Sequence, residues 1–204
     1  MTFTRFIAIV SLIGISVSDA AKNGVLTDDD KQALLRLHNE HRSKTALGET
    51  RNLGETRNQP MAKDMTKLVW DEDIAKGAAS YAATCVWDHD PDTNYGENLY
   101  TSGSPYDNND KLSTLENGIS SGWYDEHVFY DFDTRTCDTE PCGHYTQEVW
   151  ANTKKLGCGY ARCSNSVWEG SDYFEIILVC RYDPPGNLNR EFPYTKTANS
   201  EEVA

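Results

Sequence analysis

The chain has 204 residues and a formal net charge of −13 at pH 7, with a sequence pI of about 4.7. An acidic surface of this kind disfavours nucleic acid and anionic lipid headgroups as partners, but it leaves proteins and neutral lipids open. The length suits one domain that buries a hydrophobic core.

The first 20 residues have the layout of a secretory signal peptide. Arg5 supplies the positive end, an apolar run extends from Phe6 to Val17, and Ser18 to Ala20 form a small-residue cleavage site. The run is too short for a spanning helix, and no later stretch can span a membrane. An uncleaved N-terminal anchor is the alternative. We expect a secreted, extracellular protein with one domain, residues 21–187, and a polar, disordered tail, residues 188–204.

Six cysteines follow the signal segment: Cys85, Cys137, Cys142, Cys158, Cys163 and Cys180. An even count in an oxidising compartment predicts three disulfides, although six cysteines allow fifteen pairings. A zinc site is the weaker alternative, because the close pairs have four intervening residues and lack a matching second knuckle.

The first predicted helix begins at Thr27, where Asp30 three residues later completes a capping-box pattern. One face of this helix carries Leu34, Leu37, His38 and His41. The hexapeptide LGETRN then occurs twice in succession, at 47–52 and 53–58, and its polarity predicts a lengthened loop.

A second helix is predicted to start near Asp71, and its apolar stripe turns Cys85 toward the interior. A long loop rich in turn-forming residues follows it and contains a short extended piece at about residues 98–101.

A third helix is predicted within KLSTLENGISSGWYDEH, residues 111–127. Its apolar stripe consists of Leu112, Leu115, Ile119 and Trp123, and Glu126 falls in the same sector. A carboxylate on an apolar stripe loses several kcal/mol of hydration unless it finds polar partners. Glu126 therefore either reaches water at the helix end or points into a polar site in a cleft.

The segment GHYTQEVW, residues 143–150, predicts a helix that follows a glycine break and runs to about Asn152. His144 at its start has three open roles: a surface position, a hydrogen bond in the core, or a ligand. Two strands are predicted after it, in LGCGYARC and DYFEIILVCRY. Helices combined with a closing strand pair indicate an α+β domain with an antiparallel sheet.

Four segments, in order, resemble the CAP superfamily of cysteine-rich secretory proteins, antigen 5 and plant pathogenesis-related proteins. They are WDEDIAKGAASYAATC, GENLY, GHYTQEVW and FEIILVCRYDPPGN, and the resemblance covers about residues 27–187. Among members, the short single-domain layout looks most similar to the venom allergen-like proteins secreted by parasitic worms. The resemblance implies a three-layer α-β-α sandwich with a central antiparallel sheet and one shallow cleft.

The resemblance also implies a tetrad in that cleft: His89 in CVWDHD, Glu97 in GENL, Glu126 in WYDEH and His144 in GHYTQ. Two imidazoles and two carboxylates suit a divalent metal with an open coordination position, zinc more than magnesium. The alternative is that the four groups hydrogen-bond one another and stabilise the floor of the cleft, so no metal is required. The other helix histidines, His38 and His41, look like a structural pair.

Family members are associated with binding of sterols and fatty acids. The loop HVFYDFDTRTC resembles the family's aromatic loop implicated in sterol capture, and its candidate residues are Phe129, Tyr130 and Phe132. The alternative is that these rings pack on the core. A fatty acid would need a separate slot between helices, walled by Leu34, Leu37 and the helix that begins at Tyr145.

Catalysis is not expected, because the sequence shows no nucleophile motif. A metal-dependent hydrolase with Glu97 or Glu126 as general base is one alternative. A secreted ligand of an unknown extracellular or host protein is another.

Family geometry together with the local spacing implies the disulfides Cys85–Cys163, Cys158–Cys180 and Cys137–Cys142, of which the last departs from the common family pattern.

Overall fold

The computed structural model describes residues 22–50, 58–104, 111–139, 141–163, 174–189 and 191–203. The predicted signal peptide and most of the second LGETRN copy lie outside these ranges. Within them, no helix combines the length and the apolar character that crossing a membrane requires.

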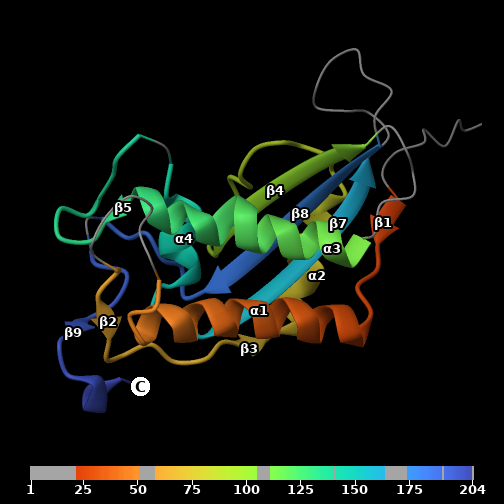
Figure 1. The fold of residues 1–204 in the computed structure, drawn as a ribbon. Helices are drawn as coiled ribbons and strands as arrows, with labels where there is room; N and C mark the ends of the chain where they lie inside the picture. The colour runs from red at the N-terminus through yellow and green to blue at the C-terminus, as the bar shows by residue number, and fades with distance from the viewer. Residues whose placement is uncertain are drawn as a thin grey trace, which may run out of the picture.

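The centre of the fold is a five-stranded sheet with the spatial order β1-β7-β8-β4 (Figure 1). Its strands are β1 (Lys22–Gly24), β4 (Gly96–Ser104), β7 (Lys155–Cys163) and β8 (Phe174–Asp183), with β3 (Val69–Trp70) beside β7. The pairs along the main path are antiparallel, and only β3 runs parallel to its partner β7 among the described strands. The predicted buried central strand is confirmed, since β8 is paired on both edges.

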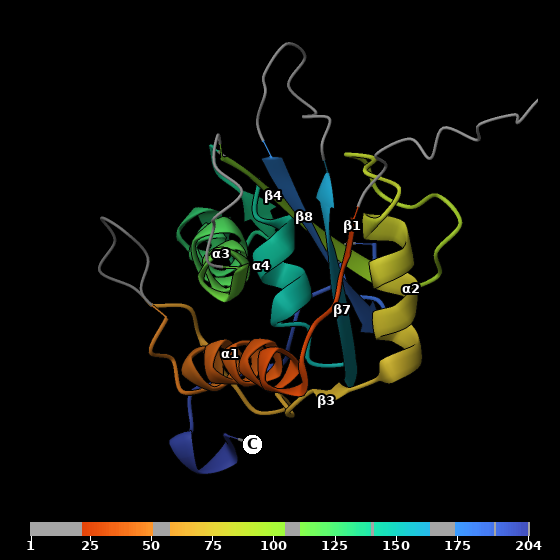
Figure 2. The ribbon, with the colours of Figure 1, turned by 90° about the vertical axis from the view of Figure 1, so that its right-hand side faces the viewer.

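Helices cover both faces of this sheet (Figure 2). Helix α2 (Glu72–Ala82) packs on one face, against β7 and β8. On the other face lie α1 (Asp28–Ala46), α3 (Lys111–Asn117) and α4 (Gly143–Glu148). The three-layer α-β-α sandwich expected from the resemblance is confirmed.

Two local features explain where α1 begins and how closely α2 packs on the sheet. The capping box of α1 is formed, because Thr27 Oγ1 accepts the N–H of Asp30 while Asp30 accepts the N–H of Thr27. Gly159 on β7 lets α2 approach closely, since a Cβ at this position would lie 2.3 Å from the Cα of Ala79.

The predicted third helix is not one continuous α-helix. Helix α3 ends at Asn117, a π-helical segment (Gly118–Trp123) follows, and a 3-10 segment (Tyr124–Phe129) completes the run. A Cβ at Gly118 or Gly122 would lie 2.6 or 2.8 Å from the ring of Tyr100. The glycines allow this close packing, and they also have low helix propensity, which favours the change in winding. Helix α4 likewise ends earlier than predicted, at Glu148.

The prediction of a disordered tail is wrong for the described residues after 187. Strand β9 (Lys196–Thr197) pairs with β2 (Met61–Ala62), and a 3-10 turn follows at Ser200–Glu202. Tyr194 is only 3% exposed and packs in the same core cluster as Tyr145. The prediction rested on the polar composition of this segment, but one aromatic side chain, Tyr194, is enough to attach the segment to the core.

Three disulfides join Cys85 to Cys163, Cys137 to Cys142 and Cys158 to Cys180. This is the pairing that the resemblance implied. Cys158 and Cys180 are directly opposed on β7 and β8. The Cys137–Cys142 bond connects β6 (Thr136–Cys137) to the residue before α4.

Candidate functional site

The four residues predicted to form a tetrad occur as two histidine–glutamate pairs. His89 Nδ1 lies 3.0 Å from Glu97 Oε1, and His144 Nδ1 lies 2.6 Å from Glu126 Oε1. Among the described residues, no group of three or more His, Cys, Asp or Glu side chains could hold a metal ion. The structure therefore brings the tetrad together pairwise and not as one metal-binding cluster.

Glu97 is held by a cation that the sequence analysis did not identify. Arg181 lies directly opposite Glu97 in the β4–β8 register and donates from Nε to Glu97 Oε2 at 2.9 Å. Its Nη2 reaches Asp90 Oδ2 at 2.5 Å, and the backbone N–H of Asp90 donates to Glu97 Oε1 at 3.0 Å. Both oxygens of the Glu97 carboxylate are thus engaged. Strand register is the signal that points to Arg181, and it cannot be read before the strands are paired.

Glu126 is engaged in a different way, at the start of α4. Its Oε2 accepts the backbone N–H groups of His144 at 2.9 Å and Tyr145 at 3.2 Å, while its Oε1 faces His144 Nδ1. The imidazole of His144 also stacks on Trp123, with 6.1 Å between ring centres. Of the two alternatives for Glu126, the structure has the carboxylate directed at polar partners in the fold.

These contacts decide how well the four residues fit a metal. Each carboxylate accepts hydrogen bonds and each Nδ1 faces a carboxylate. The ring atoms that remain to coordinate a metal are therefore the Nε2 atoms of His89 and His144. A carboxylate that orients a histidine through Nδ1 is a common second layer of a metal site. However, two imidazoles are fewer than the three protein ligands of a catalytic zinc. The residues in this conformation do not fit a complete zinc centre.

A third histidine–glutamate pair is buried between α1 and α4. His41 Nδ1 lies 2.6 Å from Glu148 Oε1, and the His41 ring stacks on Tyr124 with 3.9 Å between ring centres. His38 is fully buried and bridges the carbonyl of Leu34 and the hydroxyl of Tyr182. Both helix histidines are thus buried and hydrogen-bonded, in keeping with a structural role.

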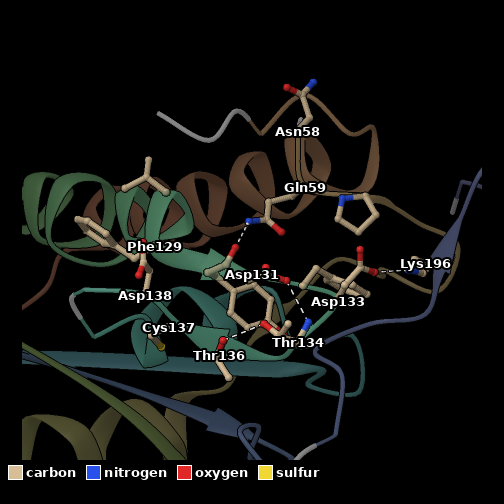
Figure 3. Close-up of a pocket in the computed structure, with 14 residues that line it drawn as sticks. Asn58, Gln59, Phe129, Asp131, Asp133, Thr134, Thr136, Cys137, Asp138 and Lys196 are labelled. Atoms are coloured by element: carbon tan, nitrogen blue, oxygen red, sulfur yellow. Dashed lines mark hydrogen bonds and ion pairs between the residues drawn. The ribbon is translucent and has the colours of Figure 1, made fainter. Parts of the chain in front are cut away.

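The aromatic loop forms a small hairpin of β5 (Tyr130–Asp131) and β6. Tyr130 and Phe132 are 5% and 6% exposed, so these rings pack on the core, whereas Phe129 is half-buried. The hairpin borders a cavity of about 550 Å³ (Figure 3). Its lining consists of residues 58–60 (Asn58, Gln59 and Pro60), the hairpin region Val128, Phe129, Tyr130, Asp131, Phe132, Asp133, Thr134, Thr136, Cys137 and Asp138, and Lys196.

The charged groups of this cavity are unbalanced. Asp131, Asp133 and Asp138 line it together with a single cation, Lys196, which pairs with Asp133 at 2.5 Å. The cavity wall is therefore acidic overall, with hydroxyl groups from Thr134 and Thr136 between the carboxylates.

The residues expected to wall a fatty-acid slot belong to two different core clusters. Leu34 is fully buried in the cluster that contains Leu115 and Trp123, and Leu37 packs against the same cluster. Tyr145 belongs to a different cluster, which contains Tyr130 and Tyr194.

The family described as "CAP: Cysteine-rich secretory protein family" matches residues 35–182. The chain belongs to the CAP family. It is 38% identical to salivary antigen-5 of Dipetalogaster maximus over 176 residues, which cover 83% of this chain and 67% of the antigen. It is 36% identical to peptidase inhibitor 16 of Mus musculus over 83% of this chain, but it spans only 30% of that relative.

Solved CAP structures agree with the fold. The structure of BmVAL-1 has a TM-score of 0.71 and 27% identity, covering 85% of each chain. The crystal structure of NaASP2 with Zn²⁺ has a TM-score of 0.66 and 28% identity, covering 86% of this chain and 90% of NaASP2. A CAP structure with bound zinc therefore exists, although the present chain forms no three-residue cluster of zinc ligands within its described ranges.

Proposed function

We propose that this CAP protein is a secreted, extracellular sterol-binding protein of the venom allergen-like type. The observation that carries the proposal is the cavity of about 550 Å³ beside the β5–β6 hairpin, the loop that resembles the family's sterol-capture loop. Its volume falls within the range of about 300–1,000 Å³ typical of small-molecule sites.

The charge of the cavity favours a sterol over a fatty acid. A fatty-acid carboxylate would meet three aspartates and one lysine that is already paired with Asp133. Like charges at close range disfavour binding. A sterol is neutral. Its hydroxyl group can donate a hydrogen bond to an aspartate, and it can donate to or accept from the hydroxyl of Thr134 or Thr136.

The aromatic residues divide into two roles in this proposal. Tyr130 and Phe132 are buried and shape the wall of the cavity, so replacing them would also disturb the core. Phe129 and Val128 are half-buried and line the cavity. We expect these two side chains to contact the apolar body of the sterol.

Binding of a fluorescent cholesterol analogue to the purified protein tests the proposal. Full burial of a large apolar side chain contributes about 1.5–3 kcal/mol, so a half-buried ring that closes on the ligand contributes about 1 kcal/mol. Phe129→Ala should therefore weaken binding about fivefold. Tyr130→Ala with Phe132→Ala should weaken it by about tenfold or more, after circular dichroism has established that the double variant folds.

Two controls locate the ligand. Val69→Ala removes an exposed apolar side chain outside the cavity, and His144→Ala removes the imidazole of the His144–Glu126 pair, so both should leave sterol affinity nearly unchanged. Palmitate should compete poorly. If His144→Ala abolished sterol binding while Phe129→Ala retained it, the ligand would lie at the His144–Glu126 pair and the proposed site would be wrong.

We propose a binding role and not a catalytic one. Glu97 and Glu126 are the candidate general bases, and the oxygens of both carboxylates are engaged in hydrogen bonds. Zinc is not required for the proposed function; if His89 and His144 bind it, they do so through Nε2. Nothing in the described residues favours a metal-dependent hydrolase or identifies a host protein partner.

A further inference from the structure

The residues after the matched CAP region form a strap across one end of the domain. We define the strap as residues 191–203, which lie beyond the family match at 35–182. Four contacts of backbone amides and the β2–β9 pairing attach the strap to the rest of the domain. Ala151 donates to the carbonyl of Pro193 at 2.7 Å, Lys63 donates to the carbonyl of Thr195 at 3.1 Å, and the N–H of Thr195 donates to both carboxylate oxygens of Asp64 at 2.9 and 3.1 Å.

The strap covers the ring of Phe132 in the aromatic loop. Phe192 stacks on Phe132 with 5.0 Å between ring centres, and the Tyr194 ring lies 4.8 Å from it. Lys196 places its Nζ 5.7 Å from the centre of the Phe132 ring while it pairs with Asp133. The strap is thus one reason why Phe132 is buried.

Two cavities lie on either side of this contact. The cavity of about 550 Å³ and a second cavity of about 290 Å³ share Phe132 and Lys196 in their linings. The second cavity is otherwise lined by Asp64, residues 151–152 and the strap residues Phe192, Pro193, Tyr194 and Thr195. The contact between Phe132 and Lys196 therefore lies at the boundary between the two cavities.

The side-chain contacts of the strap with the rest of the domain are unequal in strength. Tyr194 is 3% exposed and donates to the carbonyl of Pro60, which makes it a firm anchor. The side chains of Lys196 and Asp133 are 54% and 64% exposed, and Phe192 is 43% exposed. Exposed ion pairs contribute little to stability, so the Lys196–Asp133 contact opens more readily than the buried contact of Tyr194.

We propose that the strap is a movable wall of the ligand site, and that separation of Lys196 from Asp133 joins the two cavities into one groove through which the ligand enters. The identity of that ligand rests on the proposed sterol function. The movement of the strap does not, because it follows from the contacts of Lys196, Phe192 and Tyr194 alone.

Charge reversal tests this proposal. Lys196→Glu places two carboxylates together at Asp133, and Asp133→Lys combined with Lys196→Glu restores an opposite-charge pair. Amide hydrogen exchange at Thr195 and Ala151 reports opening of the strap without any ligand. We expect about two- to tenfold faster exchange and faster association of the cholesterol analogue in Lys196→Glu, and recovery in the double variant. Arg36→Glu, in the exposed Arg36–Glu40 pair of α1, has the same charge change and should alter neither rate.

The outcomes separate the two claims. Faster exchange and faster association in Lys196→Glu, both restored in the double variant, support the movable wall. Unchanged exchange, or faster exchange with an unchanged association rate, overturns it. If the unaltered protein binds no sterol, the proposed function fails, and the exchange rates alone then decide whether the strap opens.

Discussion

Glu148 is fully buried on α4, and its carboxyl group meets the imidazole of His41 from α1. Burial raises the pKa of Glu148 to about 8, while the nearby positive charge of Arg42 opposes that rise. Burial also lowers the pKa of His41 to about 4. At pH 7 the pair is therefore a neutral carboxylic acid beside a neutral imidazole, and not a salt bridge.

This pair predicts a stability that decreases as the pH rises above 6.5. The folded chain holds the Glu148 proton more tightly than the unfolded chain, whose glutamate has a pKa near 4.5, so this contribution is complete below pH 4.5 and lost toward pH 8. His41 acts in the opposite direction, but only between its ordinary pKa of 6.5 and its folded pKa of about 4. The free energy of unfolding should therefore fall between pH 6.5 and 8.

Urea denaturation at pH 6.5, 7.2 and 8 measures this slope. Glu148→Gln removes the titrating proton and should flatten it, whereas Glu40→Gln, an exposed position on α1, should not. An equally steep decrease in the Glu148 variant would assign the pH dependence to other groups.

At the scale of single elements, helix α4 depends on a carboxylate from another segment. The helix has six residues, and its N-cap residue Cys142 makes no side-chain capping bond. Glu126 substitutes for that cap, because its Oε2 accepts the N–H groups of His144 and Tyr145. A carboxylate at a helix N-terminus also interacts favourably with the helix dipole.

We expect Glu126→Ala to lower the free energy of unfolding by about 0.5–2 kcal/mol, the range measured for loss of a helix cap. Glu126→Gln keeps one oxygen that can accept from the backbone and should cost less. Paired urea titrations of the two variants at one pH provide the measurement. Equal destabilisation by both would mean that the charge, and not the accepted hydrogen bonds, is what α4 requires.

The elements that could be predicted from the sequence are those set by local patterns. The capping box of α1 needs only Thr27 and Asp30, and the β-branched run of β8 has few alternatives to a buried strand. The change of winding at Gly118 depends on the ring of Tyr100, and the ordered conformation of the strap depends on the pairing of β9 with β2. Contacts between segments distant in the sequence leave no periodic signal, so these two features could not be predicted.

The candidate sites follow the same division at the scale of the whole molecule. The motifs identified the four tetrad residues, because each lies within its own short segment. They predicted one converging tetrad, whereas the structure forms two separate histidine–glutamate pairs. They could not predict that Arg181 and three backbone N–H groups would occupy the carboxylates, since strand register and helix placement decide this. The cavity is also a product of the fold, because it joins residues 58–60, the hairpin and Lys196.

The net charge gives a prediction for the whole molecule. The formal charge is −13, and it stays −13 for residues 21–204 because Arg5 and Asp19 cancel in the first 20 residues. Self-repulsion of this size destabilises the compact state. An increase in ionic strength from about 0.01 M to about 0.15 M shortens the Debye length from about 30 Å to about 8 Å. Sodium chloride over this range should therefore raise the urea midpoint at pH 7.

Screening also weakens the exposed ion pairs, such as Arg36–Glu40 and Lys76–Asp73, and this acts in the opposite direction. Each of these pairs contributes only about 0–1 kcal/mol, so we expect the relief of general repulsion to prevail. The same salt step near pH 4.7, the sequence pI, is the control, because the net charge there is close to zero. Sulfate must be avoided, since it strengthens apolar burial independently of charge. A midpoint that falls with sodium chloride at pH 7 would mean that the ion pairs outweigh the repulsion.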